Sequence, residues 1–279
     1  MPAAPAAPAS ASASPSAADP ARQRLMLADG AAHIDVLAEG AGPAVVLLPS
    51  SGRDSLDFDE LADRIAASGY RVLRPQPRGM GRSRGPLDGL TLGVLAQDVA
   101  TTIERLGGGA AFVVGHAFGH FVARVLDLLH PQRVRGVVVL AGAARVFPPG
   151  LTESLEVASD IHADPALRLQ HLQKAFFAPG NDASAWLDGW YPALRAAYRQ
   201  AATEPPKDCW WPVTHAPILD LQGACDPWRP PHTRDELRAA LGDRVTVGQI
   251  EGASHAMVPE RPQQVADAIV AWMAAHAAA

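Results

Sequence analysis

Short apolar segments alternate with amphipathic helical patterns along most of the chain. The continuous apolar run at 44–48 is typical of a strand that is buried on both faces of a sheet. Further short strands are predicted at 70–73, 111–114, 134–140, 218–221 and 245–250. Apolar residues at helical spacing predict helices at 91–107, 118–129, 233–241 and 262–275. This alternation predicts an α/β fold in which helices cover both faces of a mostly parallel sheet.

The first part of the predicted fold, residues 25–60, contains sequence patterns that are typical of a turn and of a helix cap. Asp29-Gly30 separates the apolar segments 25–27 and 33–37, which predicts a β-hairpin. Asp57 and Glu60 form a capping-box-like pattern, which predicts the start of a helix.

Two segments interrupt the alternation of strands and helices. Residues 1–24 consist largely of Ala, Pro and Ser, so they bury little surface and are expected to form a disordered tail. Residues 145–212 contain helical patterns and many aromatic side chains, and they are expected to form a helical lid. The lid would be inserted between the two parts of one core, residues 25–144 and 213–279.

Composition narrows the function classes. With 279 residues and a net charge of −5, the chain has room for a large core and no reason to bind nucleic acid. No apolar run approaches the roughly 18 residues that span a bilayer, so no membrane partner is expected. Cys209 and Cys225 form neither a disulfide framework nor a metal-like spacing, which makes a reducing cytoplasm the default location. Oligomeric state does not follow from these features.

The segment Gly115-His116-Ala117-Phe118-Gly119 lies between a predicted strand and a predicted helix. A G-x-x-x-G turn at this place is strained, and its glycines allow strand and helix to approach closely. Residue 117 would then lie at the top of the sheet and at a helix N-terminus, a favourable position for a nucleophilic oxygen. Alanine has no such oxygen.

His116 and His120 have a spacing that chelates zinc when both residues lie on one helix. His116 precedes the predicted helix, however, and no glutamate lies between the two histidines. We therefore expect neither a metal nor a cofactor, and we expect His120 to pack or to form a local hydrogen bond.

Taken with four further loops, this turn resembles that of the α/β-hydrolase superfamily, and the resemblance covers roughly residues 25–276. Arg78-Gly-Met-Gly-Arg-Ser83 is similar to the R-G-x-G-x-S loop of many members. Pro49-Ser50-Ser51-Gly52 occupies the position of the H-G-x-x-G loop, with Pro49-Ser50 in place of His-Gly. The loops that end in Asp226 and His255 occupy the positions of the family's acid and histidine.

The resemblance implies roles for these residues. The order nucleophile, acid, histidine becomes Ala117, Asp226, His255, so two members of a catalytic triad are present and the nucleophile is missing. The backbone N–H groups of Ser51 and Phe118 would form the oxyanion hole.

Aromatic side chains of the expected lid indicate an apolar small-molecule substrate. Phe176, Trp186 and Trp190 are the candidate substrate-binding residues, although core packing explains such residues equally well.

Three functions remain open. In the first, the chain is an enzyme that acts on a small apolar carbonyl or ester-type substrate. Its general base would be a His255–Asp226 dyad, and it would use no serine nucleophile. Alternatively, it is an ordinary serine esterase with an inactivating Ser-to-Ala change, or a ligand-binding member without catalysis. The superfamily includes lyases, cofactor-free oxygenases, hormone receptors and members whose turn reads G-H-A-F-G.

Overall fold

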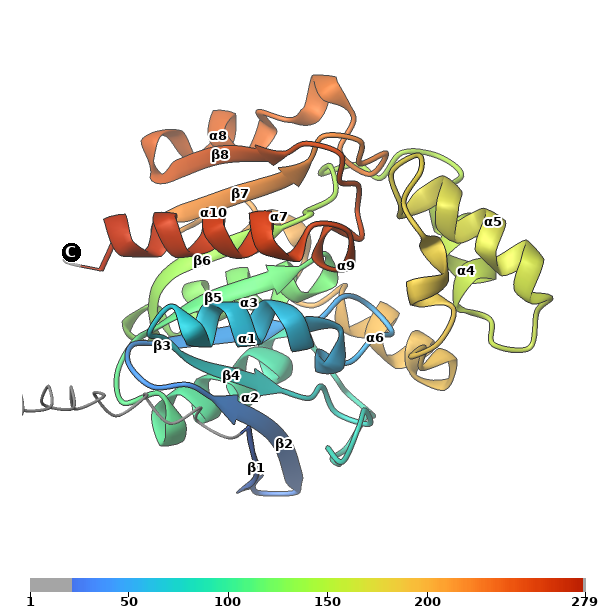
Figure 1. Ribbon diagram of the computed structural model, residues 1–279. Coiled ribbons are helices and arrows are strands. Elements are labelled where there is room, and N and C mark those ends of the chain that lie inside the picture. Colours follow the sequence, from blue (N-terminus) through green and yellow to red (C-terminus); the bar gives the residue numbers. More distant parts are fainter. Residues whose placement is uncertain (1–21, 278–279) are drawn as a thin grey trace, which may run out of the picture.

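The computed structural model of the chain describes residues 22–277. Its centre is one eight-stranded sheet in the order β1-β2-β4-β3-β5-β6-β7-β8 (Figure 1). The strands are β1 (Gln23–Asp29), β2 (Ala32–Glu39), β3 (Ala44–Leu48), β4 (Arg71–Pro75), β5 (Ala111–His116), β6 (Val134–Leu140), β7 (Ile218–Gly223) and β8 (Val245–Ile250). The pairs from β4 to β8 are all parallel, whereas β2 runs antiparallel to both β1 and β4. The predicted mostly parallel α/β sheet is confirmed.

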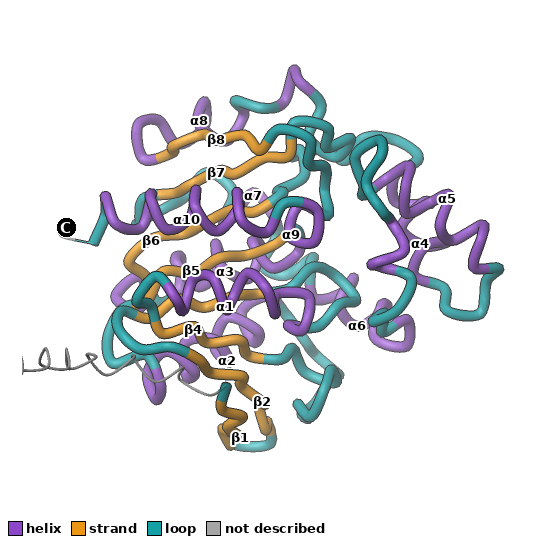
Figure 2. Tube along the Cα trace, viewed as in Figure 1, coloured by secondary structure: helices purple, strands orange, loops and turns teal. Residues whose placement is uncertain are grey.

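Helices cover both faces of the sheet, as Figure 2 shows. They are α1 (Asp59–Ala67), α2 (Leu92–Leu106), α3 (Phe118–Leu129), α4 (Leu151–Ser159), α5 (Pro165–Ala175), α6 (Arg195–Ala201), α7 (Lys207–Trp210), α8 (Glu236–Leu241), α9 (Met257–Glu260) and α10 (Pro262–Ala275). Helices α1 and α10 pack side by side on one face, and α2 and α3 pack on the other. Each face has its own apolar core, because the central strands point buried side chains alternately to the two sides.

The sheet begins earlier than the sequence pattern predicts. β1 starts at Gln23, within the predicted tail of residues 1–24, and it pairs with β2 along its whole length. Arg24 forms an ion pair with Asp35 of β2, with a distance of 2.5 Å between Nη2 and Oδ2. This cross-strand ion pair extends the strand pairing to the polar residues Gln23 and Arg24 at the start of β1. The prediction for residues 1–21 falls outside the described residues.

The start of α1 also differs from the predicted capping box. A short 3₁₀ helix, Ser55–Phe58, precedes α1, and its cap is Asp54, whose carboxylate accepts a hydrogen bond from the Leu56 N–H at 2.8 Å. Asp57 does not cap a helix, because its carboxylate is bound by the guanidinium of Arg53.

Between β6 and β7 the chain forms α4, α5, α6 and α7. Figure 1 shows α4, α5 and α6 beyond the carboxyl ends of the parallel strands. An apolar cluster of this segment includes Phe176, Trp186 and Trp190, and it packs against Trp228 and Ala256 from the loops that follow β7 and β8. The helical segment therefore covers the edge of the sheet at which those loops emerge.

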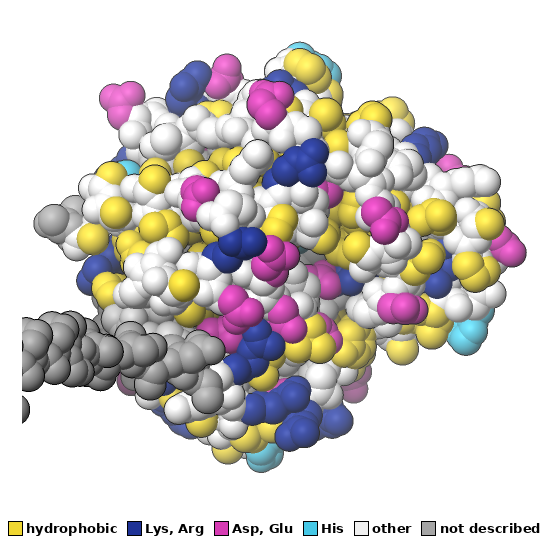
Figure 3. Space-filling model, viewed as in Figure 1, with side chains coloured by type: hydrophobic (Ala, Val, Ile, Leu, Met, Phe, Trp, Pro, Cys, Tyr) yellow, Lys and Arg dark blue, Asp and Glu magenta, His cyan; other side chains and the backbone are white. Residues whose placement is uncertain are grey.

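Figure 3 shows acidic and basic side chains interspersed over one face of the molecule, in keeping with its modest net charge. Within residues 22–277, no helix is both long enough and apolar enough to cross a bilayer.

Candidate active site

The turn between β5 and α3 places Ala117 at the carboxyl edge of the sheet. Ala117 has φ 47° and ψ −113°, a conformation that residues other than glycine seldom adopt. A Cβ atom on Gly115 would lie 2.4 Å from the Gly119 carbonyl carbon, and one on Gly119 would lie 2.3 Å from the Leu48 carbonyl oxygen. Only glycine fits at either position, which confirms the predicted close approach of strand and helix.

His255 and Asp226 meet beside this turn. Asp226 follows β7 and His255 follows β8, and His255 Nδ1 lies 3.0 Å from Asp226 Oδ2. A carboxylate only accepts hydrogen bonds, so Nδ1 carries the proton and the ring's other nitrogen, Nε2, has a free lone pair. Both residues are buried, at 4% and 3% exposure. The predicted hydrogen bond between them is confirmed.

Ser51 and Phe118 line the same cavity as Ala117. Phe118 is the first residue of α3, so its N–H has no partner within the helix. Ser51 follows β3, and its N–H donates to no group among the described residues. Gly119 brings the two segments together, because its backbone packs directly against the end of β3.

A cavity of about 270 Å³ joins these groups. Ala117, His255, Ser51 and Phe118 all line it. The rest of its wall comes mostly from the helical segment and from α3. It is mainly apolar, and it also includes the charged residues Glu156, Arg195 and Arg199. Phe176 is part of this wall, so one of the three predicted substrate-binding aromatics does face the cavity.

Trp186 and Trp190, the other two predicted substrate-binding aromatics, are not among the residues that line this cavity. Both rings pack against the Arg53 guanidinium, whose carbon is 4.7 Å from the centre of the Trp186 ring and 4.8 Å from that of Trp190. Arg53 also donates to Asp57 Oδ1 at 2.6 Å and to the Asp188 carbonyl at 2.9 Å. The two indoles thus hold the loop after β3 against the helical segment.

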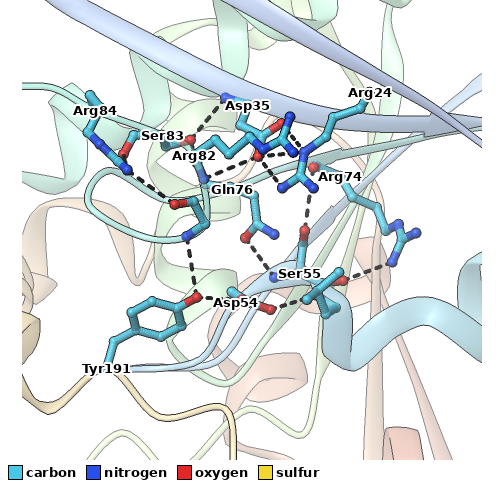
Figure 4. Close-up of polar contacts among 12 residues, drawn as sticks. Arg24, Asp35, Asp54, Ser55, Arg74, Gln76, Arg82, Ser83, Arg84 and Tyr191 are labelled. Atoms are coloured by element: carbon cyan, nitrogen blue, oxygen red, sulfur yellow. Dashed lines mark hydrogen bonds and ion pairs between the residues drawn. The ribbon is translucent and has the colours of Figure 1, made fainter.

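Figure 4 shows a second connection between the same two parts of the molecule. Tyr191 donates its hydroxyl proton to Asp54 Oδ2 at 2.7 Å and accepts a hydrogen bond from the Gly81 N–H at 3.3 Å. Ser83 of the same loop donates to the Gln76 carbonyl at 2.8 Å. Residues 78–83 therefore support the site without lining the cavity with a catalytic group of their own.

His116 and His120 each bond to a backbone carbonyl. His116 Nε2 donates to the His255 carbonyl at 2.8 Å, and His120 Nδ1 donates to the Ala117 carbonyl at 2.6 Å. Burial, together with the nearby His255 ring, lowers the pKa of His116 to about 3. Burial and the charge of Arg124 hold the pKa of His120 well below its usual value. Both rings are therefore neutral near pH 7.

Glu260 is a residue of this region that the sequence patterns did not single out. Its carboxylate accepts hydrogen bonds from the N–H groups of Ser254 and Ala178, both at 2.6 Å, and from the Asn181 side chain at 2.7 Å. It thereby ties the loop that carries His255 to the helical segment. Its one signal in the sequence is a lone acidic residue after the apolar run at 256–259.

The chain was also compared with known proteins. A model described as the alpha/beta hydrolase family matches residues 45–268. The chain is 34% identical to epoxide hydrolase B from Mycobacterium tuberculosis over 131 residues, which cover 45% of this chain and 37% of that protein. It is 27% identical to polyketide synthase ThaQ from Burkholderia thailandensis over 264 residues, which cover 89% of this chain and 12% of the synthase.

The structure is similar to that of a thermophilic esterase from Thermogutta terrifontis. The TM-score is 0.74 at 21% identity, and the match covers 91% of this chain and 99% of the esterase. At that identity the likeness shows the fold alone. The chain spans less than half of the length of the curated relatives named above. The family model, in contrast, covers most of this chain, and the chain therefore belongs to the alpha/beta hydrolase family.

Proposed function

We propose that the protein hydrolyses a small apolar ester by activating water with His255 and Asp226. The observation that carries this proposal is the hydrogen bond of 3.0 Å between His255 Nδ1 and Asp226 Oδ2, made by a histidine that lines the cavity. It orients the ring and leaves the Nε2 lone pair available as a base. In this proposal Ala117 takes the place of the nucleophile that a triad requires, so water must attack in its stead.

The proposed reaction has two proton transfers. His255 Nε2 takes a proton from a water molecule as the water oxygen bonds to the ester carbonyl carbon. The N–H groups of Ser51 and Phe118 stabilise the oxyanion of the tetrahedral intermediate. When the intermediate collapses, the bond to the alcohol oxygen breaks and His255 returns its proton to that oxygen, which leaves a carboxylic acid and an alcohol.

The composition of the cavity wall supports an apolar substrate. Phe118, Phe121, Phe176 and Trp228 line the cavity, and burying an aromatic-sized group among them contributes roughly 2 kcal/mol or more. We propose that residues 145–212 act as a lid, since this segment supplies part of the wall and covers the carboxyl edge of the sheet. The relatives' names, esterase and epoxide hydrolase, both describe additions of water and support the same reaction class.

Hydrolysis of p-nitrophenyl acetate tests this function. The unaltered chain should release p-nitrophenol above the rate in buffer, and His255→Ala should lower kcat by about 10²–10⁴-fold because the base is lost. Asp226→Asn should also lower kcat, since it favours the wrong tautomer of the ring. The exposed His162→Ala is the matched control and should leave kcat unchanged.

Equal turnover in the unaltered chain and in a folded His255→Ala variant would refute the proposed base. A folded unaltered chain that hydrolyses no ester, beside an active Ala117→Ser variant, would instead favour a serine esterase inactivated at one position. Thermal melts of each variant show whether it is folded.

A further inference from the structure

His120 is a second histidine of the cavity, and the water-activating mechanism does not use it. It is the third residue of α3, it is 2% exposed, and it lines the same cavity as His255 and Ala117. Its Nδ1 lies 2.6 Å from the Ala117 carbonyl oxygen. Because a carbonyl oxygen can only accept a hydrogen bond, Nδ1 must carry the ring's proton.

The protonation of Nδ1 determines what the other ring nitrogen can do. A neutral imidazole with its proton on Nδ1 has an unprotonated Nε2, which is a hydrogen-bond acceptor only. Burial and the nearby cations Arg124, Lys207 and Arg229 keep the ring neutral near pH 7, since all of them disfavour a second proton. Nε2 of His120 is therefore a hydrogen-bond acceptor, and it remains one throughout the neutral pH range.

Nε2 of His120 has no hydrogen-bond partner among residues 22–277, yet it is not among the buried polar atoms that are fully enclosed. It therefore remains accessible from the cavity that the ring lines. Two aromatic rings, those of Phe121 and Trp210, pack edge-on against the imidazole. A bound molecule that displaces water from this acceptor and offers no donor leaves the acceptor unpaired, which makes the binding free energy less favourable.

We propose that His120 Nε2 binds a hydrogen-bond donor, a hydroxyl or an N–H group, on the otherwise apolar substrate. The inference rests on the proposed function in one respect, because it makes the donor-bearing molecule the substrate of the His255 site. The substrate class is then an ester or related carbonyl compound with an aromatic or aliphatic body and one neutral donor group. The Ala117 carbonyl fixes the His120 ring, and the donor would bind in the same cavity as the scissile carbonyl, which His255 also lines.

Binding of phenol and of fluorobenzene tests this proposal without requiring any turnover. The two probes have nearly the same shape, and only phenol has a donor. Calorimetric titration should show about tenfold tighter binding of phenol, because only phenol can form a hydrogen bond with the otherwise unpaired acceptor. This measurement detects binding only, so its result does not depend on whether the protein hydrolyses esters.

His120→Asn is the informative variant. The asparagine Nδ2 can replace Nδ1 as the donor to the Ala117 carbonyl, whereas nothing replaces Nε2, so the preference for phenol should fall to about one. His255→Ala and the exposed His162→Asn should both keep the preference. A preference that survives in His120→Asn, or one that disappears in His255→Ala, would overturn the assignment to His120.

Nitrogen NMR of the unaltered chain provides a test that needs no variant to fold. The spectrum should show His120 as a neutral ring protonated at Nδ1, and phenol should shift its Nε2 resonance while fluorobenzene leaves it in place. A ring protonated at Nε2, or an Nε2 resonance that phenol does not move, would contradict the proposal.

Discussion

Mild acid should destabilise the protein through His116, because that ring cannot accept a proton while it is folded. His116 is 1% exposed, its Nε2–H donates to the His255 carbonyl, and its pKa is lowered from 6.5 to about 3. Between these two values the unfolded chain binds a proton at this histidine that the folded chain does not bind. The free energy of unfolding therefore has its full His116 contribution above pH 6.5, and it falls as the pH decreases toward 3.

The size of this effect follows from the shift. At 1.36 kcal/mol for each pKa unit, His116 alone should remove about 2 kcal/mol of stability between pH 7.5 and pH 5. Urea unfolding at the two pH values measures the loss. The variant His116→Gln keeps an N–H donor for the His255 carbonyl and has no titrating ring, so its loss should be smaller by about the same 2 kcal/mol.

The exposed His162→Gln is the control, and it should follow the unaltered chain. Any difference between the unaltered chain and His116→Gln is independent of the other titrating groups, because they are present in both. The reasoning fails if the two proteins lose the same stability between pH 7.5 and pH 5.

Three further predictions concern the supports of the site. Arg53→Met should lower the free energy of unfolding by about 3 kcal/mol in urea, because it leaves the Asp57 carboxylate, which is only 14% exposed, without its cation. Arg238→Met should lower it little, since the pair of Arg238 with Asp235 is exposed. Gly119→Ala should destabilise the turn in the same assay because the new Cβ meets the Leu48 carbonyl oxygen; Gly93→Ala, which meets nothing closer than 3.5 Å, should stabilise α2 by up to about 1 kcal/mol. Glu260→Gln should lower kcat for p-nitrophenyl acetate about tenfold with little change in KM, since it loosens the loop of His255 without altering the cavity wall; an unchanged kcat would show that Glu260 only stabilises the fold.

The sequence predicts the fold well because periodicity and turn signals are local. The helices at 118–129 and 262–275 have the bounds that the pattern predicts, as has the strand at 44–48. The hydrogen bond of Asp226 to His255 was predictable because both residues follow neighbouring parallel strands, whose carboxyl ends meet at one edge of the sheet.

The remaining features depend on contacts between distant parts of the chain. The local sequence does not show whether an aromatic side chain faces a cavity or packs against a cation. Trp186 and Trp190 pack against Arg53, which lies far earlier in the chain, so no local pattern could reveal this contact. Asp57 matches a capping pattern, yet its carboxylate is bound by Arg53, which lies four residues earlier in the loop after β3. Glu260 could not be recognised because two of its partners, Ala178 and Asn181, lie in the helical segment.

In the proposed mechanism, water activated by His255 attacks the substrate, and no covalent intermediate forms on the protein. Stopped-flow measurement of p-nitrophenol release from p-nitrophenyl acetate tests it most directly, with the unaltered chain and Ala117→Ser side by side. We expect steady release without an initial burst from the unaltered chain, and a burst from Ala117→Ser, which restores an attacking oxygen in the cavity that His255 lines. A burst from the unaltered chain would reveal an acyl-enzyme on another residue and would contradict the account.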